Sequence, residues 1–317
     1  MTIINSSSQN QLLRGTNYGD NGVDAYAKFA HGSDLGLFLN VFVANDLDQL
    51  NQQEGKKLLD AGCGAAPWSI YAAKKGAIVN AIDLQPGMIK NAKEAIEQAG
   101  PLSGRIVSEV GDATDLSFED KMFDHAISIN VGCNLPTSIF SKHFEEIGRV
   151  LKKDGTATIA LPYSLDVVFT DGSKEANEVQ ARITKVLSGL PSNPKDQEIQ
   201  NKLGELEEIV SATFAVIGNR LVLVDDINRL ESGQKIWRKL TKVTIPNHYH
   251  SQDEYIKAFE KGNLKIVEIS QRTLRSSEER DMINALDIHP KLGEEYERHP
   301  PFLVYHLTKK LNINENN

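Results

Sequence analysis

Acidic residues and glycines follow short apolar segments that have the pattern of buried strands. The first segment ends in Asp60-Ala61-Gly62-Cys63-Gly64, and the next ends at Asp83, about 20 residues after the glycines. Glycines after a parallel strand let a ligand approach backbone N–H groups, and a carboxylate at this spacing suits the hydroxyls of a ribose. The spacing therefore predicts a nucleoside-binding site.

The same region favours a positively charged nucleoside over a dinucleotide. A dinucleotide-binding turn carries a third glycine, where this chain has Pro67. Asp60 beside the glycines would repel a diphosphate and attract an ammonium or sulfonium group. Asp112, which follows a third apolar segment, could accept a hydrogen bond from an adenine amino group. Three acids at three predicted strand ends thus indicate a cationic nucleoside.

These acids need elements that bring them together, and the chain from residue 56 to 162 has the pattern of such elements. Short apolar segments alternate there with amphipathic ones, which predicts a parallel sheet covered by helices. Strands are expected over residues 57–61, 77–83, 105–110, 122–130 and 156–161, and helices over 67–75, 86–99 and 137–151. A helix over 252–261 and strands over 264–270 and 302–308 resume the pattern.

Residues 163–250 interrupt this alternation and are expected to form an insertion. Two stripes of aliphatic residues at helical spacing, one starting at Ile183 and one running from Ile199 to Ile217, predict helices. Short strands are expected over 220–224 and 242–245. The prediction is a mainly helical insertion over the carboxyl edge of the sheet.

Composition narrows the classes of partner. The net charge is −8, so there is no overall basic field for nucleic acid or anionic lipid, and a small-molecule partner is expected instead. Two cysteines in 317 residues give neither a disulfide framework nor a paired-cysteine metal site, and no metal is expected. The start of the sequence has no apolar segment of the kind found in secretory signals or membrane spans. We therefore expect a cytoplasmic protein that has no membrane as a partner.

Several segments resemble the motifs of class I S-adenosylmethionine-dependent methyltransferases of the small-molecule type. The first motif of that family, with the residues that follow it, is similar to LLDAGCGAAPWSIYAAKKGAIVNAIDLQPGMIKNAKE in this chain. The later motifs of the family are similar, in the same order, to GDATDL, FDHAISIN and LKKDGTATIALP. HYHSQDEYIKAFEKGNLKIVEIS is similar to the segment that carries the sixth strand. The resemblance does not extend over the insertion.

The resemblance implies a fold and a set of cofactor contacts. The fold is α/β, a Rossmann-like, doubly wound, mostly parallel seven-stranded sheet, with the insertion as a lid. The expected organisation is a helical cover over residues 1–55, a cofactor-binding domain over 56–162 and 251–310, the inserted subdomain over 163–250 and a flexible tail over 311–317. The residues implied to contact S-adenosylmethionine are Asp60, Ala61, Gly62 and Gly64 at the methionine portion, Asp83 at the ribose, Leu84, Met88, Asp112 and Ala113 around the adenine, and Asn130 and Val131 near the sulfonium.

Residues for the methyl acceptor are expected on segments that cover the carboxyl edge of the sheet. Tyr26 and His250 are predicted to be catalytic, because a histidine can act as a base near neutral pH and an aromatic ring can face a cation. His31, Tyr163 and His248 are predicted to contact the acceptor. Asn130-Val131-Gly132-Cys133 does not resemble the tetrad of enzymes that methylate amino groups of nucleic-acid bases.

Three classes of function remain open at this point. A small-molecule methyltransferase is the first, an enzyme that uses the same cofactor for a different transfer is the second, and a catalytically silent nucleoside-binding regulator is the third. The aliphatic stripes of the insertion suit a lid over the site, and they equally suit the contact surface of a homodimer.

Overall fold

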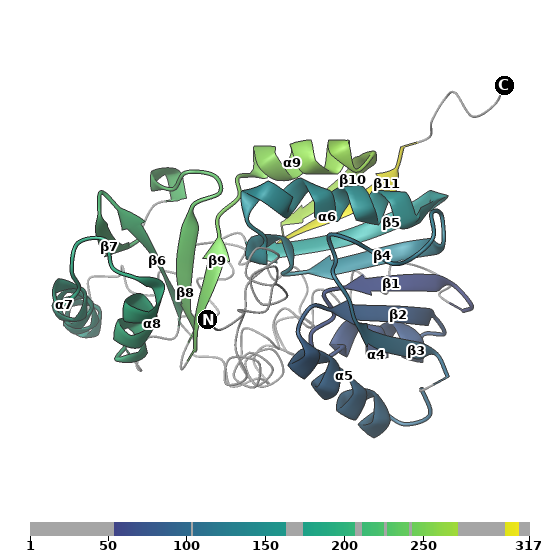
Figure 1. Ribbon diagram of the computed structural model, residues 1–317, viewed down its shortest axis with the longest axis horizontal. Helices are drawn as coiled ribbons and strands as arrows, with labels where there is room; N and C mark the ends of the chain where they lie inside the picture. Colours follow the sequence, from purple (N-terminus) through teal and green to yellow (C-terminus); the bar gives the residue numbers. More distant parts are fainter. Residues whose placement is uncertain are drawn as a thin grey trace, which may run out of the picture.

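A computed structural model describes residues 54–102, 104–162, 174–206, 211–224, 227–240, 243–271 and 302–310. In these residues the strands form one seven-stranded sheet and one four-stranded sheet, which lie side by side in Figure 1. The predicted helical cover over residues 1–55, apart from residues 54 and 55, and the predicted tail lie outside the described residues.

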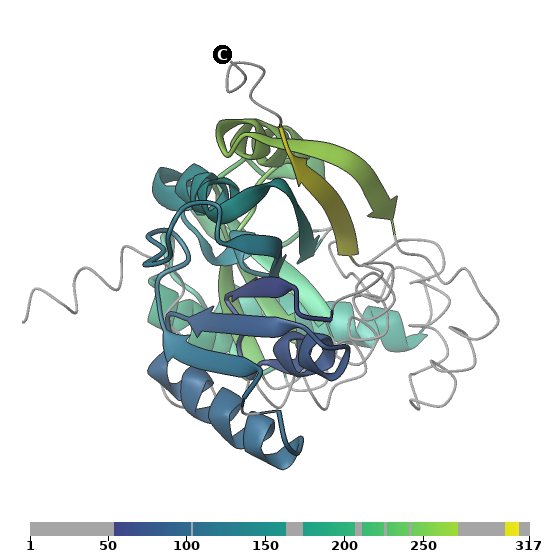
Figure 2. The same ribbon diagram turned by 90° about the vertical axis from the view of Figure 1, so that its right-hand side faces the viewer.

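The seven-stranded sheet has the strand order β10-β11-β5-β4-β1-β2-β3. Strands β1 to β5 run parallel, and β11 is antiparallel to both of its neighbours, β5 and β10 (Figure 2). This confirms the predicted α/β fold class. The strands are β1 (Lys57–Ala61), β2 (Ile78–Asp83), β3 (Ile106–Val110), β4 (Phe123–Ile129), β5 (Leu151–Pro162), β10 (Leu264–Gln271) and β11 (Phe302–Lys309).

Helices cover both faces of this sheet. They are α4 (Pro67–Lys74), α5 (Pro86–Gln98), α6 (Thr137–Val150) and α9 (Gln252–Lys261). The chain moves outward from β1 to β2 in one direction and from β4 to β5 in the other, so right-handed crossovers place α4 and α6 on opposite faces. The point where the direction reverses, between β1 and β4, is where open α/β sheets bind ligands at the carboxyl ends of their strands.

Strand β5 begins earlier than predicted. It starts at Leu151, directly after α6, instead of near residue 156. Leu151 pairs with Phe123 before a register shift on β4, and regular pairing resumes where His125 meets Thr156. The four residues between, which the sequence marks as a helix terminator, therefore form an irregular first part of the strand.

The insertion is less helical than predicted. Helices α7 (Lys174–Ser188) and α8 (Asp196–Gly204) are followed by a four-stranded antiparallel sheet of order β7-β6-β8-β9. Its strands are β6 (Ser211–Ile217), β7 (Arg220–Leu223), β8 (Lys235–Leu240) and β9 (Val243–His248).

The second predicted helical stripe is wrong over residues 211–217. Residues 211–217 read SATFAVI, and their β-branched and aromatic residues favour a strand. Ala212 and Phe214, two residues apart, are both buried against Ile199 and Leu203 of α8. A strand, in which every second side chain faces the core, therefore continues the apolar surface that we interpreted as the spacing of a helix, with about 3.6 residues per turn.

Two glycines allow α6 and α9 to pack closely. A Cβ atom added at Gly148 of α6 would overlap the carbonyl oxygen of Gly262, the residue after α9. A Cβ atom added at Gly262 would overlap the carbonyl oxygen of Phe144. The contact places Phe144, Phe259 and Tyr305, all almost fully buried, in one core on this face of the sheet.

We therefore expect Gly148→Ala to destabilise the fold by about 1–3 kcal/mol, because the backbones cannot separate without loosening this core. Urea unfolding followed by circular dichroism measures the change. Gly204→Ala is the matched control, since a Cβ atom there meets nothing within 4 Å at the end of α8. Equal stabilities for the two variants would contradict the close packing.

Candidate functional site

The glycine turn after β1 has the backbone conformation that the sequence predicts. Gly62 and Gly64 have φ values of 88° and 54°, in the left-handed region that favours glycine. The N–H groups of Gly62 and Cys63 both donate to the carbonyl oxygen of Ile82, at 2.8 Å each. A Cβ atom at Gly62 would overlap Val131, whereas one at Gly64 would meet nothing within 4 Å. The backbone of the turn is thus hydrogen-bonded to β2 and packs on Val131, and open space lies beside Gly64.

Asp83 lies at the end of β2 and faces this turn. Its Oδ2 atom accepts a hydrogen bond from Gly64 N–H at 3.0 Å, and its Oδ1 atom accepts one from Gln85 N–H at 2.9 Å. Burial raises the pKa of the carboxyl group above its ordinary value. Each carboxylate oxygen can accept a second hydrogen bond, so the two oxygens present the acceptor pair that a ribose diol requires.

Asp60 is an almost fully buried carboxyl group at the start of the turn. Its side chain is 1% exposed, and its Oδ2 atom accepts a hydrogen bond from the hydroxyl of Ser69 at 2.6 Å. Burial raises its pKa to about 7, and the nearby charge of Asp83 acts in the same direction. Burial also raises the pKa of the Cys63 thiol, which keeps that thiol protonated. Because the charge of Asp83 disfavours the charged form of Asp60, a cation beside the two groups would be favourable.

The loop after β3 brings the third acid to the same edge of the sheet. Gly111 N–H donates to the carbonyl oxygen of Asp83 at 3.0 Å, which joins the ends of β3 and β2. Asp112 Oδ1 accepts hydrogen bonds from the N–H and the hydroxyl of Thr114, so its orientation is fixed. Ala113 is half-buried beside it. The three acids therefore lie at the carboxyl ends of β1, β2 and β3, at the same edge of the sheet.

Two residues predicted to border an adenine have different surroundings. Leu84 is half-buried in the turn that precedes α5. Met88, 2% exposed, is one of the residues through which α5 packs on the sheet.

Three polar residues on α6 hold the loop after β3, and the sequence analysis missed them. His143 Nδ1 donates to the carbonyl oxygen of Ala113 at 3.0 Å, and its Nε2 atom accepts from the Ser128 hydroxyl at 2.9 Å. Burial lowers the pKa of this histidine to about 4, which keeps the ring neutral. Glu146 Oε2 accepts from Leu116 N–H at 2.8 Å. Arg149 donates to backbone carbonyl groups of the same loop. Their spacing of three residues along one predicted helix was the available signal.

Asn130 and Val131 follow β4 at the centre of this edge. Asn130 has a φ of 57°, and its carbonyl oxygen accepts from Asn134 Nδ2 at 2.7 Å. Within the described part of the chain, its buried Oδ1 atom has no hydrogen-bond partner. Val131 packs on Gly62, as noted above. An unsatisfied amide oxygen beside the glycine turn is an acceptor that a ligand could use.

His250 does not fit its predicted role as a catalytic base. Its Nε2 atom donates to the carbonyl oxygen of Leu135 at 2.8 Å, and its Nδ1 atom bonds to Glu254 Oε2 at 3.0 Å. The ring stacks on Phe140 with the ring centroids 3.9 Å apart. Because both nitrogens are engaged and the side chain is fully enclosed, His250 joins α9 to the segment before α6. This prediction is corrected on that ground.

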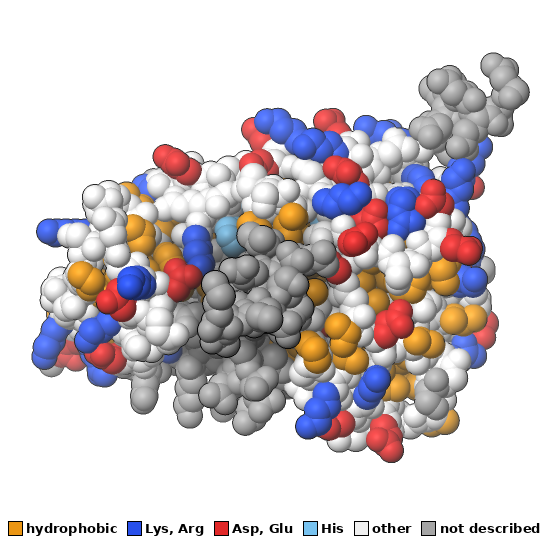
Figure 3. Space-filling view, viewed as in Figure 1, with side chains coloured by type: hydrophobic (Ala, Val, Ile, Leu, Met, Phe, Trp, Pro, Cys, Tyr) orange, Lys and Arg blue, Asp and Glu red, His pale blue; other side chains and the backbone are white. Residues whose placement is uncertain are grey.

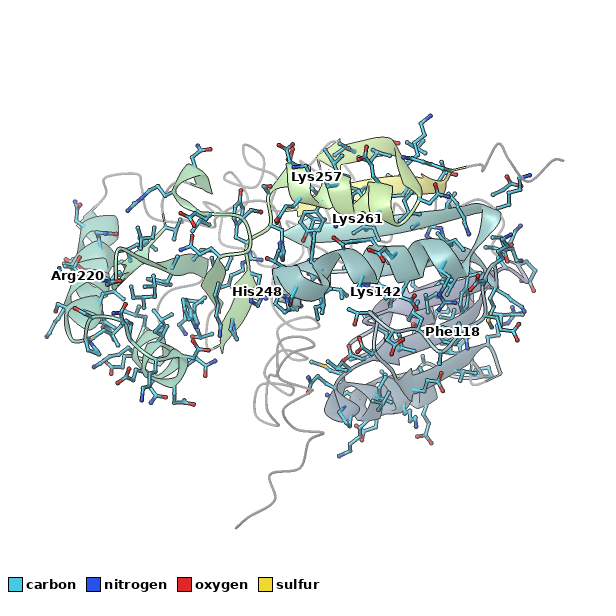
Figure 4. All side chains as sticks on the ribbon, turned by 45° about the horizontal axis from the view of Figure 1, so that its top comes forward. Phe118, Lys142, Arg220, His248, Lys257 and Lys261 are labelled. Carbon is cyan, nitrogen blue, oxygen red and sulfur yellow. The ribbon has the colours of Figure 1, made fainter. Side chains whose placement is uncertain are left out.

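His248 lies at the junction of the four-stranded sheet and the amino-terminal end of α6 (Figure 4). Burial lowers its pKa to about 4, and its Nδ1 atom has no partner among the described residues. The other predicted acceptor residues, Tyr26, His31 and Tyr163, lie outside the described residues. No group of three or more His, Cys, Asp or Glu residues in the described ranges could hold a metal ion.

Comparison with protein families matches residues 58–155 to a family described as a methyltransferase domain. The strands and turns that carry the three acids all lie within the matched residues.

Residues 58–155 form a methyltransferase domain.

Curated relatives resemble the chain over this domain. Sterol methyltransferase-like 2 of Botryococcus braunii is 34% identical over 143 residues, which are 44% of this chain and 35% of that protein. The magnesium-protoporphyrin O-methyltransferase of Rhodobacter capsulatus is 30% identical over 122 residues, 38% of this chain and 47% of that enzyme. The chain thus spans less than half the length of either relative.

A solved structure is similar in fold to most of this chain, beyond the methyltransferase domain alone. The S-adenosylmethionine dependent methyltransferase of Mesorhizobium loti has a TM-score of 0.52 and 18% identity. The alignment covers 88% of this chain and all of that one. At this identity the match shows the fold alone.

The residues at the sheet edge fit the cofactor of this family, S-adenosylmethionine. The open space at Gly64, the oriented carboxylate of Asp83 and the unsatisfied Asn130 oxygen lie at one edge. Burial disfavours the charged forms of Asp60 and Asp83, and a sulfonium beside them would favour those charged forms. Of the helices in the described ranges, none has the length and apolar character needed to cross a membrane.

The raised pKa of Asp60 predicts a trade-off between stability and binding. A folded-state value of about 7 exceeds the ordinary 3.8, so the folded chain keeps a proton that the unfolded chain loses, and stability falls as pH rises through this range. Asp60→Asn removes the buried charge. We expect a melting temperature several degrees higher at pH 8 (on the order of 2–4 °C per kcal/mol), no change near pH 4, and about tenfold weaker S-adenosylmethionine binding.

Asp124→Asn is the matched control. Burial acts to raise the pKa of Asp124, but hydrogen bonds from the Lys152 side chain and from Lys57 N–H lower it overall. The control should therefore lose stability at pH 8. Thermal melts of both variants at several pH values check the sign, and a destabilised Asp60→Asn at pH 8 would contradict the argument.

Proposed function

We propose that the whole chain is a methyltransferase that transfers the methyl group of S-adenosylmethionine to a small-molecule acceptor. The observation that carries this proposal is the placement of Asp83, whose carboxylate is oriented by Gly64 and Gln85 beside the open glycine turn. The matched family and the curated methyltransferases support the reaction type.

Each residue at the sheet edge has a proposed part in holding the cofactor. Asp60, Ala61, Gly62 and Gly64 would surround the methionine portion, and Asp83 would bind the ribose hydroxyls. Leu84, Asp112 and Ala113 would border the adenine, with His143 fixing Ala113 from behind. Asn130 and Val131 would form the floor next to the sulfonium. Met88 would support this wall through its packing.

When bound, the cofactor supplies a methyl group on a sulfonium, already activated for in-line displacement. The protein then has to align the acceptor and exclude water. The loop after β4 and the four-stranded sheet are the described elements placed to do this, because Asn247 of β9 donates to Asn134 of that loop at 2.7 Å. We propose that the insertion is a lid over the acceptor; contact between two copies of the chain is the alternative.

Charge supports a small acceptor over nucleic acid. The net charge is −8, and on the face seen in Figure 3 basic and acidic side chains are interspersed over the described residues. Sterols and a porphyrin are the substrates that the names of the two curated relatives indicate for those proteins. Tyr26, His31 and Tyr163 stay predictions as acceptor or catalytic residues, and so does a cytoplasmic location.

Asp83→Ala tests the cofactor site directly. Removing the carboxylate should weaken binding of S-adenosylhomocysteine about 10- to 150-fold, because two hydrogen bonds to a charged group contribute roughly 1.5–3 kcal/mol. Isothermal calorimetry below the melting temperature measures the affinity. Glu109→Gln, an exposed carboxylate on neighbouring β3, should bind normally. Unchanged affinity in Asp83→Ala would overturn the proposed site.

Transfer itself is tested with methyl-labelled S-adenosylmethionine and a small-molecule cell extract. Label should move to a small molecule with the unaltered protein and with Glu109→Gln, and much less with Asp83→Ala at limiting cofactor. Tight binding without any labelled product would favour a catalytically silent binding protein instead.

A further inference from the structure

Strand β9 carries a contact between the four-stranded sheet and the cofactor site. It is the edge strand of that sheet that lies nearest the seven-stranded sheet (Figure 1). Asn247 of β9 is 4% exposed, and its Nδ2 atom donates to Asn134 Oδ1 at 2.7 Å. Asn134 belongs to the loop after β4, 113 residues earlier in the chain. A residue of the insertion therefore reaches the loop that borders the glycine turn.

The side chain of Asn134 extends this contact to Asn130. Its Nδ2 atom donates to the carbonyl oxygen of Asn130 at 2.7 Å. A carbonyl oxygen can only accept, so this bond fixes which end of the Asn134 amide faces Asn130 and which end faces Asn247. We call Asn247, Asn134 and Asn130 the amide chain. Hydrogen bonds in such a chain polarise one another, so that each strengthens the next.

Asn130, at the end of the amide chain, has an unusual backbone conformation. Its φ is 57°, in the left-handed region that residues other than glycine rarely adopt. Its N–H donates to the carbonyl oxygen of Ala160 at 2.8 Å. Its own carbonyl oxygen accepts from Asn134 and, at 3.4 Å, from the thiol of Cys133. The hydrogen bond from Asn134 is therefore one of the contacts that hold Asn130 in this conformation.

The residues after Asn130 pack closely on two neighbouring elements. A Cβ atom added at Gly62 would overlap the side chain of Val131, and one added at Gly132 would lie 2.8 Å from the hydroxyl oxygen of Tyr255 in α9. A small displacement of the peptide between Asn130 and Val131 would therefore move the wall of the glycine turn. The hydrogen bond that holds the carbonyl group of this peptide opposes that displacement.

We infer that Asn247 is a positioning residue for methyl transfer: through Asn134 it fixes the loop that holds Asn130 and Val131 beside the cofactor. This inference rests on the proposed function, because it extends the cofactor site of that proposal to a residue outside the matched residues 58–155. A connection between two sites works in both directions, so bound cofactor also holds β9 in place.

Asn247→Leu and Asn134→Leu each remove one amide group of the amide chain. We expect either variant to bind S-adenosylhomocysteine about 2- to 30-fold more weakly than the unaltered protein, because the loop then has to be ordered by the ligand. The double variant should bind no more weakly than Asn134→Leu alone, since Asn247 acts only through Asn134. Calorimetry below the melting temperature of each variant measures the affinities.

Two controls separate the amide chain from the rest of the insertion. Asn201→Leu makes the same substitution at an exposed position of α8. Ser232→Ala removes a hydroxyl that accepts from Ser251 N–H at 2.9 Å and donates to Glu254 of α9, so it loosens the same junction without removing an amide of the chain. Both variants should bind S-adenosylhomocysteine as the unaltered protein does.

Hydrogen exchange followed by mass spectrometry distinguishes positioning from a purely structural role. In the unaltered protein, saturating S-adenosylhomocysteine should slow exchange both in β2 (residues 78–83) and in β9 (residues 243–248). In saturated Asn247→Leu, β2 should keep this protection and β9 should lose it. A residue that only stabilised the insertion would change exchange without ligand and leave the effect of the ligand on β9 unaltered.

Three results would overturn the inference: unchanged affinity in Asn247→Leu, additive losses in the double variant, or no protection of β9 by S-adenosylhomocysteine in the unaltered protein. The last result needs no variant, so it decides the matter even where Asn247→Leu does not fold. If the unaltered protein binds S-adenosylhomocysteine and any of these results is found, the inference fails and the cofactor site stands. If the unaltered protein does not bind S-adenosylhomocysteine, the proposed function itself fails.

Discussion

The Asp83 carboxylate accepts one hydrogen bond from the glycine turn and one from the start of α5, and the geometry of the site depends on this bridge. Ile82, the residue before it, accepts from Gly62 and Cys63 through its carbonyl oxygen, and Asp83 accepts from Gly111 through its own. The ends of β1, β2 and β3 are therefore joined at one short segment of β2. Apart from the Asp83 carboxylate, these joining groups are backbone atoms, so the three strand ends are held together largely without the side chains around them.

Helix α6 is the second organiser of the same edge. It holds the loop after β3 through His143, Glu146 and Arg149, and it is anchored to α9 by the close contact at Gly148. Asp112, which lies in this loop, is thus positioned in part by a helix that packs on the loop. Preorganisation of this kind reduces the ordering cost of binding, since the loop has already lost its freedom before the ligand arrives.

The sequence predicts the seven-stranded sheet well because each of its elements carries a local signal. Buried parallel strands are continuous apolar segments, Gly62 and Gly64 mark the turn, and Asp83 lies at the spacing that βαβ geometry requires. The insertion lacks such signals: the largely buried antiparallel strand Ser211–Ile217 continues the apolar spacing of the preceding helix, so its sequence does not show where the helical pattern ends. His250 was misjudged for a different reason. Its bond to Leu135 and its stacking on Phe140 depend on packing between segments that are far apart in the chain, which no local pattern encodes.

Asp60 belongs to the glycine turn and is almost fully buried. Its carboxyl group loses hydration on folding, and burial raises its pKa to about 7 although the Ser69 hydroxyl donates to it. A cation beside Asp60 would favour the charged form of this group, and a sulfonium supplies that cation while a neutral thioether does not. The desolvation that makes Asp60 unfavourable for stability would therefore help the site to distinguish the methyl donor from its spent form.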